Sequence, residues 1–294
     1  MIDRLRTTLI LIGLIAGAVT FVACEESDNR VVITPSEAAF VPVIESSDLF
    51  VGVPKLVLTL LERDRQPEFG EDAKFRIRYF EPTEGGIKFH SEAELRTIDV
   101  EGLRYLVATE PPFQVGGTWA IAVTVELGDG NAESSPRLSF VVNDSPRGLA
   151  AGSTAPDVPT PTIADGVLER MPDTPDSFLG LYEQSASQLI SSGEPFLIVW
   201  ASADRCAGRL ACARAVDQAR TIYDQDMIAV LHVEPFGRPR PAALQALIDS
   251  GNEAWGIEAE PQFFVIDEEG SVAARFEIVV EQSDLEAAIE EALR

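Results

Sequence analysis

The sequence is poor in basic residues, in histidine and in cysteine. Only 23 Lys and Arg oppose 48 Asp and Glu, which leaves a formal net charge of −25 over 294 residues. Nucleic-acid binding depends on clusters of Lys and Arg, so this scarcity excludes it as a function class. The sequence also has no glycine-rich phosphate loop, no Ser-His-Asp order and no separate carboxylate cluster. It therefore indicates no bound cofactor.

What the sequence does contain is typical of globular protein. Hydrophobic residues make up 46% and charged residues 24% of a chain long enough for two domains, each with its own core. We interpret the excess of acidic residues as a means of solubility, with a specific basic partner as the alternative.

The N-terminus has the pattern of a secretory signal. Two arginines precede an uncharged apolar run, Thr7 to Ala23, and a polar run begins directly after Cys24. This pattern resembles a bacterial lipobox, which implies that residues 1–23 are removed and Cys24 is lipidated, although Phe21 stands where the box usually has Leu. The alternatives are an uncleaved anchor helix, for which the run is short, and plain secretion. All three place the remaining chain outside the cytoplasm, and the first two anchor it to a membrane.

Residues 53–143 show only β patterns. The segment from Ala73 to Phe80 alternates apolar and basic side chains, as a strand with one buried face does. Five to seven strands without a long helical period predict an immunoglobulin-like sandwich, preceded by an extended lead-in at residues 24–52. The expected strands lie at 56–61, 73–80, 103–108, 119–127 and 138–142.

A composition change separates this domain from the next one. Residues 144–177 are crowded with Pro, Gly, Ser, Thr and Asp, which predicts a stiff, solvated linker. Strand and helix patterns then alternate over residues 178–294, and this order predicts an α/β domain whose mixed sheet is covered by helices on both faces. Helices are expected at 182–192, 207–223, 242–249 and from Ser283, and strands at 195–200, 227–233, 262–267 and 271–277.

Two cysteines, Cys206 and Cys212, remain if Cys24 carries lipid. Outside the cytoplasm such a neighbouring pair is more often bonded or redox-active than idle. The apolar strand that ends in Val199-Trp200-Ala201, the Cys-bearing loop, the following helix and Glu260-Pro261 before a later strand together resemble thioredoxin. The chain is similar to a group of secreted bacterial proteins that place an immunoglobulin-like domain before a thioredoxin-like one.

This resemblance implies thiol–disulfide exchange with partner proteins. Cys206, at the N-terminus of a helix that favours the thiolate, would attack, and Cys212, inside the helix, would resolve mixed disulfides. Pro261 would be a cis proline and would shape the substrate groove together with Trp200. From the sequence alone, Pro261 is equally an ordinary strand start and Trp200 equally a core aromatic.

The cysteine spacing departs from the family. Thioredoxins have two residues between their cysteines, whereas Cys206 and Cys212 are separated by five. Within one continuous helix that spacing rises about 9 Å along the axis, so a disulfide requires Cys206 to lie in the preceding loop. We expect it there. A static disulfide and two unreactive thiols are the alternatives to redox exchange.

Two other functions stay open on the sequence. One is a redox-silent binding protein that keeps the thioredoxin shape as an interaction surface. The other is copper delivery through Cys206, Cys212 and His232, because copper proteins on this fold use a Cys pair with a histidine. A buried, hydrogen-bonded histidine is the commoner meaning of His232, since it lies within a predicted strand.

Overall fold

The computed structural model of the protein describes residues 39–62, 67–167, 176–202, 209–236 and 240–294, without the side chains of 176–178 and 209. The predicted signal, the predicted lipidation site Cys24 and the predicted nucleophile Cys206 lie outside these residues. No helix in the described part of the chain is long and apolar enough to cross a membrane.

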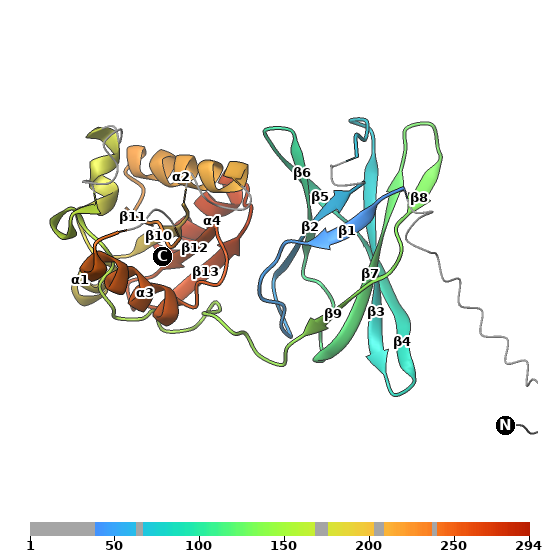
Figure 1. Cartoon of the computed structure of the whole chain (residues 1–294), viewed down its shortest axis with the longest axis horizontal. Coiled ribbons are helices and arrows are strands. Elements are labelled where there is room, and N and C mark those ends of the chain that lie inside the picture. Colours follow the sequence, from blue (N-terminus) through green and yellow to red (C-terminus); the bar gives the residue numbers. More distant parts are fainter. Residues whose placement is uncertain (1–38, 63–66, 168–175, 203–208, 237–239) are drawn as a thin grey trace, which may run out of the picture. The chain divides into compact units, whose positions relative to one another are not determined.

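Two antiparallel sheets form a β-sandwich in the first half of the described chain (Figure 1). One sheet has the strand order β1-β2-β6-β5 and the other has β4-β3-β7-β8, with β9 also paired to β7. The strands are Val41–Ile44 (β1), Lys55–Leu61 (β2), Lys74–Thr83 (β3), Gly86–Glu94 (β4), Arg96–Val100 (β5), Leu103–Thr109 (β6), Gly117–Glu126 (β7), Ala132–Ser134 (β8) and Leu138–Val142 (β9).

The alternation in β3 decides which side chains enter the sandwich core. Phe75, Ile77 and Tyr79 lie between the sheets and are at most 3% exposed, whereas the two arginines between them lie on the outer face. Trp119 of β7 packs into the same core. Burial of side chains of this size contributes roughly 1.5–3 kcal/mol each. The core therefore holds together a sandwich whose strands contain no cysteine.

The sandwich has more strands than the sequence pattern predicts. β1 lies inside the expected lead-in of residues 24–52 and pairs with β2, and Phe40 beside it is buried in the core. Its four residues, one of them Pro42, are too short to show a period. β4 is an edge strand with nearly every residue exposed, so it lacks the alternation that marks a half-buried strand.

A four-stranded mixed sheet forms the core of the second half, as predicted. Its order is β11-β10-β12-β13, with β10 and β11 parallel and the other pairs antiparallel. Helices α2 and α4 cover one face, and α1 and α3 cover the other (Figure 1). The elements are Ala186–Ser192 (α1), Phe196–Trp200 (β10), Arg209–Asp224 (α2), Ala229–Val233 (β11), Ala242–Trp255 (α3), Gln262–Ile266 (β12), Val272–Glu277 (β13) and Gln282–Ala292 (α4).

β10 is buried along its whole length because both of its faces are covered. Leu197 and Val199 pack against α2 and α4, while Ile198 and Trp200 pack toward α1 and α3. This explains the continuous apolar run in the sequence, which has no polar alternation.

The helix ends follow local capping rules only in part. Ser185 caps α1 by accepting the N–H of Gln188, and Gly193 ends the helix in the left-handed conformation with φ of 69°. α4 begins at Gln282, one residue before the expected start at Ser283, and the side chain of its cap, Glu281, accepts no capping hydrogen bond.

The linker is packed onto the α/β sheet where it is described, whereas its composition predicts a solvated connector. Its backbone bonds the start of β13, because Gly152 N–H donates to Val272 O at 2.8 Å and Val272 N–H donates to Ser153 O at 2.8 Å. Thr160 is 1% exposed and its Oγ1 accepts the N–H of Ala186 at the start of α1. Backbone pairing of this kind depends on which strand of the folded sheet has unpaired N–H and C=O groups. The amino-acid composition of the linker does not contain this information.

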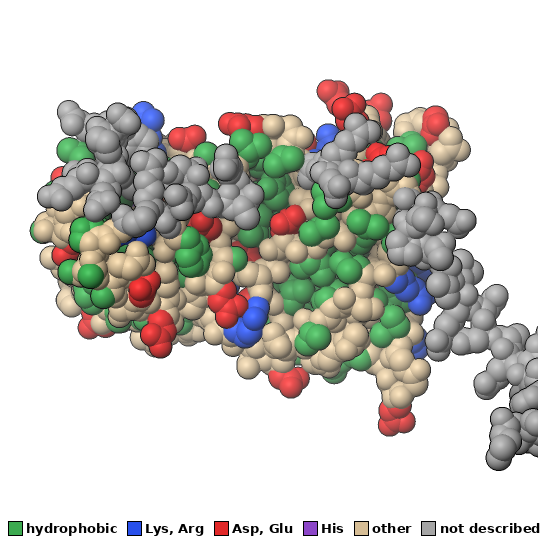
Figure 2. All heavy atoms as spheres, in the orientation of Figure 1, with side chains coloured by type: hydrophobic (Ala, Val, Ile, Leu, Met, Phe, Trp, Pro, Cys, Tyr) green, Lys and Arg blue, Asp and Glu red, His purple; other side chains and the backbone are tan. Residues whose placement is uncertain are grey.

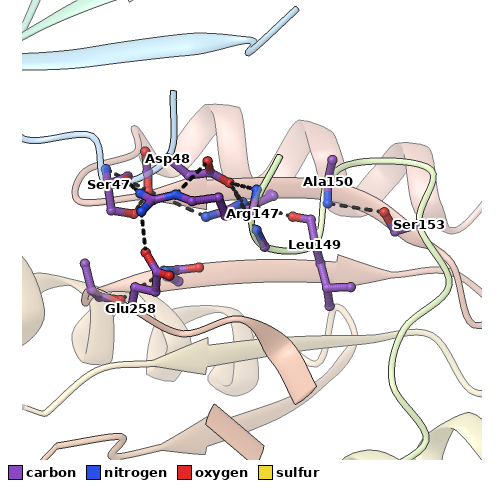
Figure 3. Close-up of polar contacts among 12 residues, drawn as sticks. Ser47, Asp48, Arg147, Leu149, Ala150, Ser153 and Glu258 are labelled. Carbon is purple, nitrogen blue, oxygen red and sulfur yellow. Dashed lines mark hydrogen bonds and ion pairs between the residues drawn. The ribbon is translucent and has the colours of Figure 1, made fainter. Parts of the chain in front are cut away.

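Polar contacts also tie the linker to the sandwich (Figure 3). The Asp48 carboxylate accepts the backbone N–H of Arg147 at 2.9 Å and lies 3.5 Å from Arg275 of β13. Arg147 in turn pairs with Glu258 at 3.2 Å.

Acidic side chains are scattered over the face of the molecule that Figure 2 shows. Among the described residues on this face they form no single patch.

Candidate functional site

Cys212 lies in the first turns of α2, on the side of the helix that faces the sheet. Its side chain is fully buried among Val199 of β10, Phe263 of β12 and Ala215 of α2. Cys212 is disulfide-bonded. Both other cysteines of the chain, Cys24 and Cys206, lie outside the described residues. The buried position of Cys212 on the sheet-facing side of α2 agrees with the expectation that it lies on the protected face of the helix.

Pro261 stands directly before β12, and the Glu260–Pro261 peptide bond is cis. Pro261 is buried, and its carbonyl oxygen accepts the N–H of Ile278 at 2.9 Å, so it lies within the sheet framework. The next residue, Gln262, is the register partner of Trp200 at the end of β10. Pro261 therefore lies next to the end of β10, the strand that precedes Cys206 in the sequence.

Trp200 is placed as a core aromatic. Its ring is fully buried on the α1 and α3 side of the sheet, 6.1 Å from the ring of Trp255 between centroids. An added Cβ at Gly251 would lie 2.9 Å from this ring, so the glycine makes room for it. Because Cys212 lies on the opposite face of the same sheet, Trp200 does not form a groove wall beside that sulfur.

His232 is held between two hydrogen-bond partners in the protein interior. Its Nε2 lies 2.7 Å from the carbonyl oxygen of Ala201, and its Nδ1 contacts the Tyr182 hydroxyl. A carbonyl oxygen only accepts, so Nε2 carries the proton and Nδ1 accepts from Tyr182. Burial lowers the pKa of His232 to about 4 and raises the pKa of Tyr182. The pair is therefore neutral at physiological pH.

This arrangement leaves neither ring nitrogen of His232 free for a metal. No group of three or more His, Cys, Asp and Glu suited to a metal ion occurs among the described residues. His232, the third ligand in the copper hypothesis, therefore has a hydrogen-bond partner in the protein on each ring nitrogen.

Glu260 is a half-buried carboxylate at the end of β10. Its Oε2 accepts the backbone N–H of Ser202 at 2.7 Å. Burial raises the pKa of Glu260 to about 7, the hydrogen bonds from Ser202 oppose that rise, Glu234 adds to it and Arg240 opposes it. Glu234 and Arg240 pair with each other at 3.2 Å. A cavity of about 30 Å³ lies beside this pair and His232, enough for about one water molecule.

The structure gathers residues that the sequence pattern does not mark. Tyr182, Ser202, Glu234 and Glu260 surround the end of β10, yet they come from four separate segments, so no spacing in the sequence announces them. The one available signal is a charged residue, Glu260, directly before a proline and a fully apolar strand.

A larger cleft of about 230 Å³ is lined by none of the predicted site residues that the structure describes, which are Trp200, Cys212, His232 and Pro261. Its apolar lining comes mostly from the segment before β2 (Phe50, Val53 and Pro54), from Ala150 and Ala151, and from Val57, Phe276 and Val279. Its charged lining is Asp48, Lys55, Arg275 and Glu277.

No protein-family model matches the chain, and no curated protein matches it. Solved structures with a likeness to part of it are small β domains, among them a fibronectin type-III domain of human fibronectin type III domain containing protein 3, CopC from Methylosinus trichosporium OB3b, and murine CRIg. The fibronectin type-III domain is 20% identical, and the match covers 38% of this chain and 88% of that one, with a TM-score of 0.23. CopC is 14% identical, with 36% and 94% covered and a TM-score of 0.23. CRIg is 8% identical, with 35% and 98% covered and a TM-score of 0.22. At TM-scores this low the likeness carries no argument about this chain.

Proposed function

We propose that residues 178–294 are a thioredoxin-like domain that exchanges disulfides with partner proteins through Cys206 and Cys212. The observation that carries the proposal is the position of Cys212. It is a disulfide-bonded, fully buried cysteine at the start of the helix that follows the central strand β10. The mixed sheet with helices on both faces and Pro261 at the start of the neighbouring strand support the same fold assignment.

The exchange would proceed in two balanced steps. In the reduced protein the Cys206 thiolate attacks one sulfur of a partner disulfide, that S–S bond breaks, and one partner sulfur leaves as a thiolate. Cys212 then attacks the Cys206 sulfur, forms the internal disulfide and releases the second partner thiolate. Two electrons pass from the protein to its partner, and the reverse sequence oxidises a partner dithiol.

We further propose that the domain works outside the cytoplasm, held at a membrane through Cys24. Oxidising surroundings there are compatible with a disulfide at Cys212. The sandwich and linker would connect the anchor to the exchange domain. A Cys24→Ser variant is expected to move from the membrane fraction to the soluble fraction after cell lysis, and retention in the membrane would contradict lipid anchoring.

Insulin reduction by the full chain in detergent, with dithiothreitol as electron source, tests the exchange activity. The unmodified chain should accelerate precipitation of the insulin B chain, and Cys206→Ser and Cys212→Ser should abolish the acceleration. Cys24→Ser is the matched cysteine control and should leave it unchanged. Activity that survives in Cys206→Ser would show that Cys206 is not the nucleophile.

Equilibration with glutathione separates exchange from a static disulfide. A structural disulfide in a secreted protein has a reduction potential below about −300 mV, whereas an exchanging pair lies above that value. A potential below it, together with no insulin reduction, would favour the redox-silent binding protein.

A further inference from the structure

The chain enters the segment that carries Cys206 through Ala201 and Ser202. Ala201 is fixed to β11, since its N–H donates to Val233 O at 2.9 Å and its carbonyl oxygen accepts His232 Nε2 at 2.7 Å. Both partners keep their charge state across neutral pH, because a backbone carbonyl does not titrate and His232 is neutral above a pKa of about 4.

Ser202 is fixed by two further elements. Its hydroxyl bonds the backbone of Phe236, accepting that N–H at 3.2 Å and donating to the carbonyl oxygen of the same residue. Its own backbone N–H donates to the Glu260 carboxylate at 2.7 Å. Ser202 is fully buried, so its backbone N–H cannot exchange this partner for bulk water without movement of the chain.

We propose that Glu260 is a positioning residue for thiol exchange: its ionised carboxylate fixes Ser202, the residue from which the chain continues toward Cys206, and its protonation weakens that hold. The inference rests on the proposed function. A carboxylate accepts an N–H hydrogen bond about twice as strongly as a neutral acceptor does.

The charges around Glu260 place this change near neutral pH. Burial raises the pKa of Glu260 to about 7, with Glu234 adding to the rise and Arg240 opposing it. Glu258, on the same loop, pairs with Arg147 at 3.2 Å. Among the described neighbours, Tyr182 and His232 stay neutral over this range.

Alkylation of the reduced full chain by iodoacetamide tests the inference without requiring exchange activity. The rate of Cys206 modification, read by peptide mass spectrometry, is measured from pH 6 to pH 8 for the unmodified chain and for Glu260→Gln. Glutamine keeps an acceptor oxygen but cannot ionise. The rate of the unmodified chain divided by the rate of Glu260→Gln should therefore rise about fivefold from pH 6 to pH 8, which is the lower end of typical coupling between sites. Glu258→Gln is the matched control from the same loop, and its ratio should stay constant.

The amide resonance of Ser202 gives a second measurement that needs no variant. In the unmodified chain it should titrate with a midpoint near the pKa of Glu260, and in Glu260→Gln it should not titrate. A Ser202 amide that does not titrate would overturn the inference, and so would a constant alkylation ratio. A ratio that falls with pH would also overturn it, because the carboxylate would then act as a charge on the thiol and not through Ser202.

The outcomes separate this inference from the proposed function. If alkylation depends on Glu260 but the chain does not reduce insulin, the positioning role of Glu260 is supported and the proposed exchange activity is contradicted. If the unmodified chain reduces insulin but its alkylation rates follow pH as those of Glu260→Gln do, the exchange activity is supported and the positioning role is contradicted.

Discussion

Two buried tyrosines show how the two halves of the protein differ. Tyr79 in the sandwich is 1% exposed and Tyr182 in the α/β half is 3% exposed, and burial raises the pKa of both. The Tyr79 hydroxyl has no hydrogen-bond partner in the described part of the chain, whereas Tyr182 donates to His232, which donates to Ala201.

The difference reflects what each interior does. In the sandwich, buried serines bond the backbone of neighbouring strands, as Ser46 does with Val57 N–H and Ser135 with Val123 N–H, both at 2.9 Å. These bonds complete the sheets. In the α/β half, buried polar and titratable groups instead converge on the end of one strand, β10.

The largest expected effect is loss of a core aromatic in the sandwich. Trp119→Ala should lower the free energy of unfolding by about 3–5 kcal/mol, because it leaves a cavity and removes the bond from Trp119 Nε1 to Val115 O. Chemical denaturation measures it. Val141→Ala, at a side chain 62% exposed in the same sandwich, is the control and should change stability by less than about 0.5 kcal/mol. Equal effects would contradict the described core.

The next effect concerns the disulfide of Cys212. Cys212→Ala should destabilise the α/β half by about 2–4 kcal/mol under oxidising conditions. Dithiothreitol should lower the stability of the unmodified chain and leave that of the variant unchanged. If the reductant affects both equally, the disulfide does not contribute to folding stability.

The two tyrosines allow a direct test of the comparison. At pH 8, Tyr182→Phe should cost about 1–3 kcal/mol because it leaves the buried Nδ1 of His232 without a donor, whereas Tyr79→Phe removes an unpartnered hydroxyl and should be close to neutral. Thermal and chemical denaturation give both values. Equal costs would show that the hydrogen bond to His232 contributes nothing specific.

The smallest effect is a pH dependence at Glu260. Its pKa rises from 4.5 to about 7 on folding, so between these values the folded state binds more protons than the unfolded state. Stability of the unmodified chain relative to Glu260→Gln should therefore fall as pH rises from about 4.5 to 7 and then level off. With partial exposure discounted, the change is on the order of 1 kcal/mol. A difference that is flat with pH would contradict the raised pKa.

Much of the fold follows from local pattern. The alternation around Phe75 predicts a half-buried strand, and the unbroken apolar run from Phe196 to Trp200 predicts one buried on both faces; both strands form. By contrast, β1 and β4 carry no such pattern, because one is very short and the other is an exposed edge. The candidate site could be predicted only where a residue type is rare, as with Cys212, or constrains the backbone, as with Pro261.

The sequence by itself determined the β and α/β halves, their order, and the placement of Cys212 on the protected face of a helix, because hydrophobic periodicity fixes which face of an element is buried. Only the tertiary structure decided that Trp200 lies on the sheet face opposite Cys212, that the linker pairs with β13, and that Tyr182, His232, Ser202 and Glu260 meet at the end of β10. These residues are far apart in the chain, and their hydrogen bonds and pKa shifts exist only once packing has removed water from around them.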